Sequence, residues 1–226
     1  MKNFTLMILC AGFGSRMLNL TRSTPKPLLK YKNKVLLKNT IDFFTNIGCD
    51  EILINTHYLH NKIKKYLDKN FKKYPIQIIY EKKILGTGGG VKNIFNYTNR
   101  KKICVVNSDI FWTKKNKSHI KYFLNNYQDV SHCKMLLSKD NNFLGLKKEN
   151  GDFNLKRNVV INWKNKNEKL YYSGLQIVSK NIFNNRKKIF PMNEIWIKLI
   201  EKNQIKGYVI PSKIRHIGDK KSILEN

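Results

Sequence analysis

The residue types best suited to chemistry gather in a glycine-rich stretch near the start of the chain. Residues 11–16 read Ala-Gly-Phe-Gly-Ser-Arg and follow an apolar run, and Lys26 stands further along between two prolines. Glycines that directly follow a buried strand let backbone N–H groups turn toward phosphate oxygens, which bulkier residues would obstruct. Arg16 adds positive charge, and the two prolines restrict the backbone so that the Lys26 ammonium is held in one place. This stretch predicts a loop that binds a phosphate-bearing ligand.

Two other kinds of phosphate-binding loop are excluded by the same residues. A dinucleotide-binding fingerprint needs a third glycine, where Met17 stands, and an acidic residue at the end of the second strand, where Asn55 and Thr56 stand. A P-loop needs Gly-Lys-Ser or Gly-Lys-Thr, and neither residues 11–16 nor residues 86–92 contain that motif. The loop must therefore bind phosphate in another way.

Two further clusters carry groups that suit a nucleotide. Residues 86–90 read Gly-Thr-Gly-Gly-Gly at the expected start of a helix, where small residues let a flat base or a ribose approach the backbone. Asp109 follows an expected strand, where a carboxylate suits a magnesium ion that keeps most of its waters. Each cluster alone also has a plain structural interpretation, because the glycines could form a turn and Asp109 could cap a helix. Their order and spacing favour the nucleotide.

The elements that must position these residues alternate between apolar runs and amphipathic stretches, which is typical of a layered α/β domain. Strands are expected at residues 6–10, 51–55, 76–80, 102–107, 131–138, 142–147, 153–156, 170–179 and 207–210. Helices are expected at residues 36–47, 59–71 and 193–203 and, as a short one, after Asp219. Asp109 then lies just past a strand end, where open parallel sheets bind ligands. An Asn-Gly-Asp turn at residues 150–152 predicts a hairpin between its neighbouring strands.

Length and composition favour one soluble domain. The 226 residues can bury a sizeable core. No segment approaches the roughly 18 apolar residues of a membrane span, and the first residues do not resemble a cleavable signal. We therefore expect a cytoplasmic protein without a membrane partner. The four cysteines lie far apart and form no CxxC pair, so we expect small buried side chains rather than a zinc site or a disulfide framework.

The formal net charge of +29 raises the question of an anionic partner. Lysines are scattered over almost every expected helix and loop, and the densest groups, such as residues 62–65 and 114–117, lie at helical spacing or in loops. This distribution favours a solvated surface over a dedicated nucleic-acid site, so no nucleic-acid partner is expected. Small anionic substrates would still be attracted.

Together these motifs resemble those of the sugar-1-phosphate nucleotidyltransferases, almost from end to end. The signature loop of that family is similar to residues 12–17 with residues 25–27, its base-binding segment to residues 85–89, and its metal-binding aspartate to Asp109. The most similar branch is that of the N-acetylmuramate 1-phosphate uridylyltransferases, whose bacterial members are also called mannose-1-phosphate guanylyltransferases. The residues that resemble this branch are 172–176, 190–196 and 216–218.

The resemblance implies a Rossmann-like, three-layer α/β/α domain of the GT-A-like nucleotidyltransferase type, with a mixed, mainly parallel central sheet. It implies a single domain over residues 1–226, with a nucleotide-binding half at 1–112 and a sugar-phosphate-binding half at 113–226. It also implies Mg²⁺ as cofactor and, as substrates, a nucleoside triphosphate (UTP or GTP) and a sugar 1-phosphate. The residues expected to bind the nucleotide are Ala11, Gly12, Gly14, Ser15, Arg16, Lys26, Gly86, Thr87 and Gly88.

The resemblance also implies catalytic roles. Arg16 would hold the triphosphate, Lys26 would neutralise charge around the reacting α-phosphate, and Asp109 would hold magnesium. Gly174 and Asn193 would lie near the sugar phosphate. A phosphate monoester has a second pKa of about 6, so the attacking oxygen is already largely anionic and needs no general base. Positioning and cations should then drive in-line attack.

The chain departs from the family pattern at two positions. The family loop usually has proline where Asn19 stands, a change that would loosen the loop modestly. The tail motif commonly has a second metal-binding aspartate where His216 stands, two residues before Gly218. Two interpretations of His216 stay open: it contacts the metal directly or through water, or it is structural and Asp109 is the sole protein ligand. Asp219 could cap the last helix.

The expected function is transfer of a nucleotidyl group to a sugar 1-phosphate, forming an NDP-sugar and pyrophosphate. UTP and N-acetylmuramate 1-phosphate are the first expectation, with a role in cell wall recycling, and mannose-1-phosphate guanylyl transfer from GTP is the alternative. A catalytically silent nucleotide-sensing or RNA-binding protein on the same fold is a different class. Residues 142–169 lack the Glu-Lys-Pro segment common in relatives that use glucose 1-phosphate. No feature indicates an oligomeric state.

Overall fold

The computed structural model describes residues 3–125, 127–145, 150–162 and 169–224. The strands are β1 (Phe4–Cys10), β2 (Lys30–Tyr31), β3 (Lys34–Val35), β4 (Cys49–Thr56), β5 (Ile76–Tyr80), β6 (Lys102–Asn107), β7 (Ile110–Phe111), β8 (Cys133–Lys139), β9 (Phe143–Leu144), β10 (Phe153–Lys156), β11 (Val159–Asn162), β12 (Leu170–Ser179), β13 (Ile205–Val209) and β14 (Ile214–His216). The α-helices are α1 (Leu36–Thr45), α2 (His60–Asn70), α3 (Gly86–Ile94), α4 (Lys117–Leu124), α5 (Asn193–Glu201) and α6 (Lys220–Leu224). Two 3₁₀ helices near the site are η1 (Ser15–Thr21) and η2 (Lys26–Leu28).

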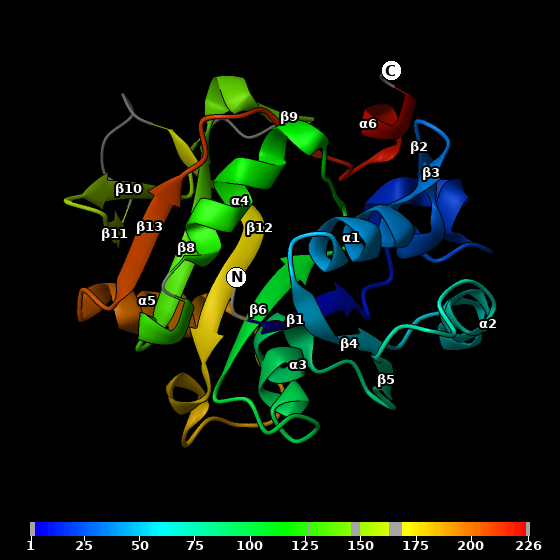
Figure 1. The fold of residues 1–226 in the computed structure, drawn as a ribbon, viewed down its shortest axis with the longest axis horizontal. Coiled ribbons are helices and arrows are strands. Elements are labelled where there is room, and N and C mark those ends of the chain that lie inside the picture. Colours follow the sequence, from blue (N-terminus) through cyan, green and yellow to red (C-terminus); the bar gives the residue numbers. More distant parts are fainter. Residues whose placement is uncertain (1–2, 126, 146–149, 163–168, 225–226) are drawn as a thin grey trace.

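Within the described residues, nine strands form one central sheet in the order β10-β11-β13-β8-β12-β6-β1-β4-β5. The strands β6, β1, β4 and β5 run parallel to one another, whereas β12 runs antiparallel to both β6 and β8. Figure 1 shows this sheet crossing the molecule from the β10–β11 ribbon to β5. The mixed sheet with helices packed on it confirms the expected Rossmann-like fold.

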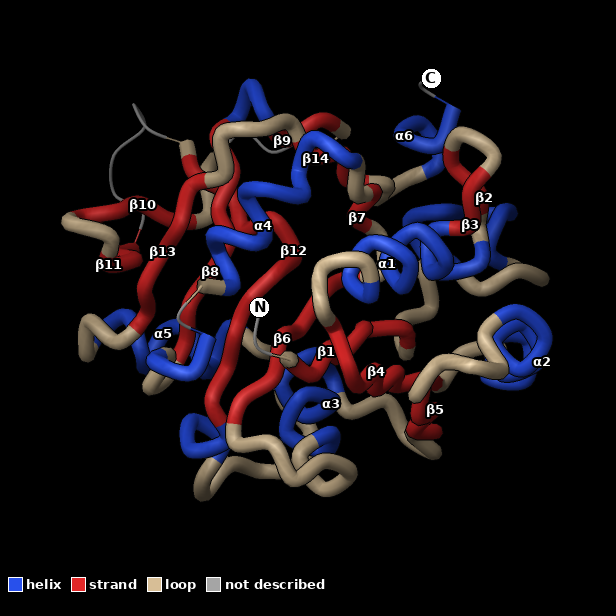
Figure 2. The backbone as a smooth tube through the Cα atoms, viewed as in Figure 1, coloured by secondary structure: helices blue, strands red, loops and turns tan. Residues whose placement is uncertain are grey.

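Helices cover both faces of the sheet and make three layers. Helices α1, α2 and α4 bring Ile41, Ile63 and Phe123 into one hydrophobic cluster. Helices α3 and α5 bring Val91 and Ile195 into a second cluster. Neighbouring residues of β1 alternate between the two clusters, because successive side chains of a strand point to opposite faces. In Figure 2 the strands of the central sheet run between these helices.

Helix α1 shows how sequence spacing becomes packing. Leu37, Ile41 and Phe44 recur at helical intervals, and all three side chains are fully buried. Burial of an apolar side chain of this size stabilises the fold by roughly 1.5–3 kcal/mol relative to exposure. The helix ends at Thr45, and the chain then turns through Gly48, whose φ of 104° favours a residue without a Cβ. The expected helix at residues 36–47 is confirmed.

Most of the other expected elements are also present. Strands β5, β6, β10 and β12 have the expected bounds, and α2 and α5 lie within one or two residues of theirs. The pattern did not predict the short strands β2, β3, β7, β11 and β14 or helix α4. Runs of two to four residues are too short to show a periodicity, which is why most of these elements were missed.

The expected hairpin across residues 150–152 is wrong for the described strands. Strand β9 pairs with β14 in a separate small sheet, and residues 146–147 of the expected strand lie outside the described residues. Strand β10 instead forms a hairpin with β11. Arg157 and Asn158 join these strands with φ angles of 49° and 66°, as in the tight two-residue turns whose twist matches that of the strands. Arginine is unusual in such a turn, so these two residues carry little signal of a hairpin.

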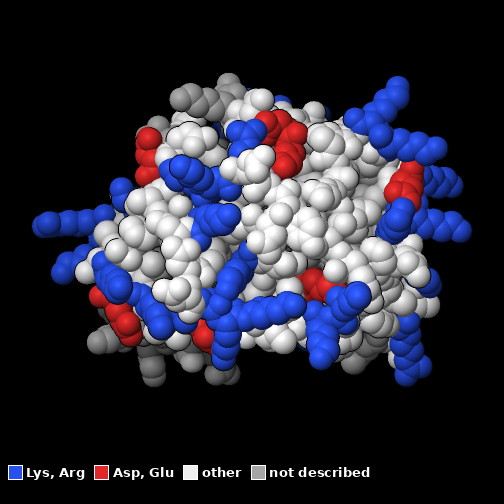
Figure 3. All heavy atoms as spheres, turned by 90° about the horizontal axis from the view of Figure 1, so that it is seen from below, with Lys and Arg blue, Asp and Glu red and all other residues white. Residues whose placement is uncertain are grey.

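The expectations drawn from charge, apolar segments and cysteines can be compared with the structure. On the face shown in Figure 3, Lys and Arg side chains project in many directions and Asp and Glu lie between them, so positive charge is spread over this face. Among the described residues, no helix has both the length and the apolar character that crossing a membrane requires. All four cysteines are free, with Cys10, Cys104 and Cys133 buried and Cys49 half-buried, as expected.

Candidate active site

The glycine-rich loop leaves the carboxyl end of β1 and continues into η1. Gly14 has a φ of 69°, and a Cβ there would lie 3.0 Å from the Thr21 side chain and 3.1 Å from that of Lys26. The Gly14 carbonyl accepts hydrogen bonds from the Met17 N–H at 2.8 Å and from the Thr21 hydroxyl at 3.1 Å. Gly12 differs, because nothing lies within 4 Å of a Cβ built on it. Gly14 is needed by the loop itself, whereas Gly12 faces open space.

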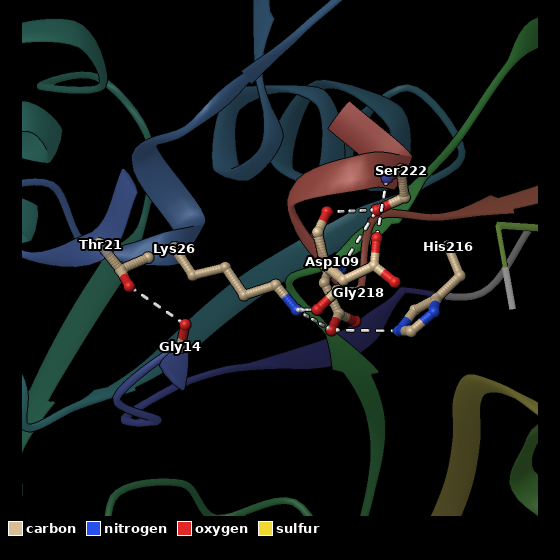
Figure 4. A network of polar contacts seen from close by, with 8 residues as sticks. Gly14, Thr21, Lys26, Asp109, His216, Gly218 and Ser222 are labelled. Atoms are coloured by element: carbon tan, nitrogen blue, oxygen red, sulfur yellow. Dashed lines mark hydrogen bonds and ion pairs between the residues drawn. The ribbon is translucent and has the colours of Figure 1, made fainter. Parts of the chain in front are cut away.

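Lys26 is held against Asp109. It begins η2 between two prolines and is 9% exposed. Its Nζ donates a hydrogen bond to Asp109 Oδ2 at 2.6 Å and lies 3.5 Å from the Gly218 carbonyl oxygen. Figure 4 shows the extended Lys26 side chain reaching these two acceptors. The short helix and the ion pair therefore fix the ammonium in one place.

A small three-stranded sheet brings His216 to the same carboxylate. In the order β7-β14-β9, His216 pairs with Ile110, the residue that follows Asp109. The Ile217 N–H donates a hydrogen bond to the Asp109 carbonyl at 2.8 Å. His216 Nε2 then lies 3.4 Å from Asp109 Oδ2, on the side away from Lys26 (Figure 4). The register of two short strands thus places a histidine beside the predicted metal-binding aspartate.

Two neighbouring side chains, Lys26 and His216, act on the charge state of Asp109. Burial alone would raise the pKa of Asp109, but the hydrogen bond from His216 and the positive charge of Lys26 together lower that pKa well below its ordinary value. Asp109 Oδ1 and His216 Nδ1 are buried without a hydrogen-bond partner among the described residues. Since buried polar atoms are nearly always paired, these two atoms are candidates for contact with a bound ligand or cation.

Asp219 lies close to this network and has a structural role. Its Oδ1 accepts a hydrogen bond from the Ser222 N–H at 2.8 Å, and the Ser222 hydroxyl donates to the Asp219 carbonyl at 2.6 Å. A carboxylate that accepts from an N–H in the first turn is a helix N-cap. The expected capping of α6 is confirmed.

A cavity of about 350 Å³ collects most of the residues predicted to bind the nucleotide. It lies at the carboxyl ends of β1 and β6, where parallel sheets bind ligands. Arg16, Lys26 and Asp109 all line it, so the three predicted catalytic side chains converge. The other predicted residues that line it are Ala11, Gly12, Gly14, Ser15, Gly86 and Thr87.

Gly88 is the predicted nucleotide residue that the structure does not bring to this cavity. Its N–H donates a hydrogen bond to the Phe190 carbonyl at 3.1 Å, and a Cβ on Gly88 would lie 2.4 Å from the Phe190 ring. Gly86 lines the cavity with a φ of 73°, and its Cβ would lie 2.7 Å from the same carbonyl oxygen. Close packing of α3 against the segment before α5 thus explains glycine at 88.

Sequence reasoning missed a buried acid in the wall of this cavity. Glu81 follows β5, lines the cavity and is 3% exposed. Its carboxylate accepts hydrogen bonds from Asn55 Nδ2 at 2.7 Å and from the Leu85 N–H at 3.2 Å. Asn55 Oδ1 in turn accepts from the Cys10 N–H at 3.1 Å. The available signal was a glutamate at a strand end, five residues before Gly86.

A second cavity, of about 440 Å³, adjoins the first. Arg16 and Asn107 line both cavities. Gly174 and Asn193, the residues expected near the sugar phosphate, line the second one together with His216. Residues predicted from β12 and α5 therefore lie next to the cavity that holds the predicted nucleotide residues.

The second cavity also has side chains that sequence reasoning missed. Asp152 lines it from the segment before β10, and Phe153, Tyr172 and Trp196 form an aromatic wall. The Trp196 Nε1–H donates a hydrogen bond to Gln176 Oε1 at 3.0 Å. The Trp196 ring lies 4.9 Å from the Tyr172 ring and 5.8 Å from the Phe153 ring, both edge to face. These three aromatic residues lie far apart in the sequence, so no local pattern predicts that their rings will be in contact.

Comparison with known proteins identifies relatives over nearly the whole chain. A model of the family described as "Nucleotidyl transferase" matches residues 5–145. The D-glycero-alpha-D-manno-heptose 1-phosphate guanylyltransferase of Campylobacter jejuni is 26% identical over 187 residues, covering 79% of this chain and 77% of the relative. The N-acetylmuramate alpha-1-phosphate uridylyltransferase of Caulobacter vibrioides is 25% identical over 222 residues, covering 94% and 91%. The crystal structure of HddC from Yersinia pseudotuberculosis shares the fold with a TM-score of 0.75 at 20% identity, and the match covers 98% of this chain and 97% of that one.

Proposed function

Because the chain belongs to the nucleotidyl transferase family, we propose that it joins a nucleoside triphosphate to a sugar 1-phosphate and releases pyrophosphate. One observation carries this proposal. Arg16, Lys26 and Asp109 line one cavity, and Arg16 also lines the adjoining cavity that holds Gly174 and Asn193. Two cavities that share a cationic side chain suit a reaction in which two phosphate-bearing substrates must meet.

The first cavity is assigned to the nucleotide. The open space at Gly12 leaves room for phosphate oxygens beside the backbone, and Arg16 is an exposed cation with which they can pair. Gly86 and Thr87 leave room at the other end of the cavity for a base or ribose. The second cavity is assigned to the sugar 1-phosphate, with its phosphate toward Arg16 and its sugar toward Gly174 and Asn193.

The reaction then needs placement and positive charge. An oxygen of the sugar phosphate attacks the α-phosphorus of the nucleotide and forms a new P–O bond. The bond from that phosphorus to the bridging oxygen breaks, and pyrophosphate leaves with the electron pair. The attacking oxygen is largely anionic near neutral pH, so no proton has to be removed. Lys26 is fixed beside Asp109 in the first cavity, where it would offset charge on the phosphates.

The residues present fit a divalent metal, for which we propose Mg²⁺. Asp109 Oδ1 and His216 Nδ1 have no hydrogen-bond partner among the described residues, and no group of three or more metal-ligating side chains occurs in the described part of the chain. This donor set suits an ion that arrives with substrate phosphates and keeps several waters. Asp109 would hold it, and His216 would contact it directly or through water. Such an ion neutralises phosphate charge when bound.

Two nucleotides are supported, each by a different observation. UTP with N-acetylmuramate 1-phosphate is supported by the Caulobacter vibrioides relative, which matches 94% of this chain. GTP is favoured by Glu81, a buried carboxylate in the wall of the first cavity. Guanine presents an N–H and an adjacent NH₂ as donors, whereas uracil presents one N–H between two carbonyl oxygens. Each carboxylate oxygen can accept two hydrogen bonds, so Glu81 matches guanine better.

The test is turnover of purified protein with Mg²⁺ and each pair of nucleoside triphosphate and sugar 1-phosphate. We expect pyrophosphate release that requires the sugar 1-phosphate. Lys26→Ala and Asp109→Ala should each lower the rate by about 10³-fold, because both remove a charge at the reacting phosphates. Lys64→Ala is the matched control, since Lys64 pairs with Asp68 on an exposed face of α2.

One result would contradict the proposal. If no pair is turned over and the protein instead binds RNA with a steep dependence on salt, it is a binding protein that uses the same fold.

A further inference from the structure

The connection between β4 and α2 lies against both ends of the chain that carries Arg16. Its Tyr58 hydroxyl donates a hydrogen bond that is shared between two carbonyl oxygens, that of Thr21 at 2.9 Å and that of Arg22 at 3.1 Å. The Tyr58 ring lies 5.6 Å from the ring of Phe13, which stands between two glycines of the glycine-rich loop. One side chain therefore contacts the loop before η1 and the chain where η1 ends.

Helix η1 is of a kind that needs support from outside. It is a 3₁₀ helix of seven residues, whereas 3₁₀ runs longer than about four residues are uncommon because their hydrogen bonds have poorer geometry. Among the described residues no side chain caps its start. The last carbonyls of a helix have no partner within it, and Tyr58 supplies one to those of Thr21 and Arg22. Thr21 in turn donates to the Gly14 carbonyl (Figure 4), so the support from Tyr58 extends to the start of the helix.

The position of Arg16 depends on the backbone of η1. Arg16 is the second residue of this helix and lines both cavities. It is exposed, and among the described residues no hydrogen bond or ion pair holds its guanidinium. Lys26 differs, because its ammonium is fixed by the bond to Asp109. Arg16 therefore relies on its helix for its position, whereas Lys26 has an anchor of its own.

Further contacts attach the β4–α2 connection to the same region. The His57 Nδ1–H donates a hydrogen bond to the Glu81 carbonyl at 2.7 Å, since a carbonyl oxygen can only accept. The His57 ring lies edge-on to that of Phe13 at 5.6 Å. Lys62, in the first turn of α2, donates a hydrogen bond to the Ser23 carbonyl. The connection is therefore anchored to the end of β5, and it contacts the chain beyond η1 at a second point.

From these contacts we infer that Tyr58 is a positioning residue, which holds η1 so that the Arg16 guanidinium meets the phosphates of the substrates. The inference rests on the proposed function, through its assignment of Arg16 to those phosphates. Tyr58 itself is not among the described residues that line the two cavities. Fixing a charged group before the substrate arrives lowers the cost of binding. A purely structural role of Tyr58 would instead act on stability and would not depend on Arg16.

The test measures nucleotide binding by calorimetry, with GTP or UTP, Mg²⁺ and no sugar 1-phosphate, so that no transfer occurs. Tyr58→Phe keeps the ring and removes only the hydroxyl. We expect this variant to raise the Kd of the nucleotide about fivefold, because a hydrogen bond that fixes η1 is lost. Tyr122→Phe is the matched control, since Tyr122 is an exposed tyrosine of α4, and it should leave the Kd unchanged.

Two double-mutant cycles then show whether Tyr58 acts through Arg16. Arg16→Ala alone should raise the Kd about tenfold. In that background Tyr58→Phe should change the Kd by less than about twofold, because the group that it positions is absent. In the Lys26→Ala background Tyr58→Phe should still raise the Kd about fivefold, because Lys26 is held by Asp109. The kcat/KM of Tyr58→Phe should also fall about fivefold for each substrate, since Arg16 lines both cavities.

Lys62 provides a second route if Tyr58→Phe does not fold. Lys62→Met removes the bond to Ser23 from an exposed position of α2. It should raise the Kd about threefold in the wild-type background and by less than about 1.5-fold in the Arg16→Ala background. Lys64→Met removes the same charge from the same helix, where Lys64 pairs with Asp68. This control should leave the Kd unchanged.

The failures of the two proposals are distinguishable. An equal rise in Kd from Tyr58→Phe in the wild-type and Arg16→Ala backgrounds overturns the positioning role and leaves nucleotidyl transfer standing. An unchanged Kd in folded Tyr58→Phe does the same. The absence of turnover with every sugar 1-phosphate overturns the proposed function, whereas the binding cycles still decide the role of Tyr58. A protein that binds neither GTP nor UTP overturns both.

Discussion

The two adjoining cavities are lined by different kinds of group. Backbone and small residues line much of the first cavity, at the ends of parallel strands β1 and β6, together with Lys26 and Asp109. Side chains line most of the second, and they come from the antiparallel strand β12, the segment before β10 and helix α5. Phosphates are common to all nucleotides, so backbone and fixed charge can bind them, whereas a sugar is distinguished by hydroxyl positions that only side chains can read.

The largest expected effect falls where the two cavities meet. Asp109→Asn should cost about 3 kcal/mol of stability near pH 7, because Lys26 and His216 lose their shared anionic partner. The pKa of Asp109 lies below its ordinary value in the folded protein, so its ionised form stabilises the fold above about pH 4. That contribution is lost as the pH falls further. Urea unfolding of both proteins at pH 7, 5 and 2.5 measures the difference.

The control for this variant is Asp42→Asn, which removes an exposed partner of Lys38 on α1 and should change stability little. A stability difference between wild type and Asp109→Asn that stays constant from pH 7 to pH 2.5 would contradict the assigned depression of the Asp109 pKa.

A smaller effect is expected in the second cavity. Gly174 has a φ of 81°, and an added Cβ would lie 2.7 Å from Ile110 and 3.3 Å from Asn107. Gly174→Ala should therefore cost about 2 to 3 kcal/mol through backbone strain and displaced neighbours. It should also raise KM for the sugar 1-phosphate more than KM for the nucleotide. Thermal unfolding tests the loss of stability, and steady-state kinetics tests the change in KM. An equal rise in the two KM values would contradict the assignment of the two cavities to different substrates.

The glycine-rich loop provides a matched pair with a smaller cost. Gly14→Ala should cost about 1 to 2 kcal/mol, because its φ is 69° and its Cβ would crowd Thr21 and Lys26. Gly12→Ala meets nothing within 4 Å, so stability should stay within about 0.5 kcal/mol. If phosphates occupy that space, Gly12→Ala should still lower kcat/KM about tenfold. Full activity of Gly12→Ala would argue against phosphate binding there.

The smallest effect concerns Cys10, which also lines the first cavity. Burial raises the pKa of the Cys10 thiol to about 12, although a hydrogen bond with Ser108 opposes this slightly. Very little thiolate exists near pH 7.5, and the thiolate is the reactive form. Treatment of the native protein with a thiol reagent should change its activity less than twofold. Rapid inactivation, measured beside modification of the urea-unfolded chain, would place Cys10 in a more exposed site than described.

The sequence predicted the first cavity better than the second for a physical reason. The loop at residues 11–16, Lys26 and Asp109 each follow a local signal, namely glycines after a strand, a lysine between prolines and a carboxylate at a strand end. The strands beside these signals were predicted with nearly correct bounds. The positions of the three features relative to the strands were therefore predicted as well. The family resemblance that rested on them is confirmed by the nucleotidyl transferase match.

The lining of the second cavity and the contact between His216 and Asp109 depend on long-range packing. No local sequence pattern reveals such packing. Asp152 and Trp196 meet only because β10, β12 and α5 converge. His216 reaches Asp109 only through the register of β14 on β7. Gly88 is the opposite case, since packing against Phe190 accounts for a glycine that was expected beside a base. The assigned roles of the site residues remain predictions that the experiments above address.

The pairing of β7 with β14 has a consequence for how the protein matures. Asp109 and His216 lie in opposite halves of the chain, and two short strands hold them together. Contacts between distant segments form late, because closing a long loop costs entropy before any contact compensates for it. We expect the parallel strands and their helices to assemble first. We therefore expect the pairing of β7 with β14 to form after the phosphate loop, so the loop is in place before Asp109 and His216 meet.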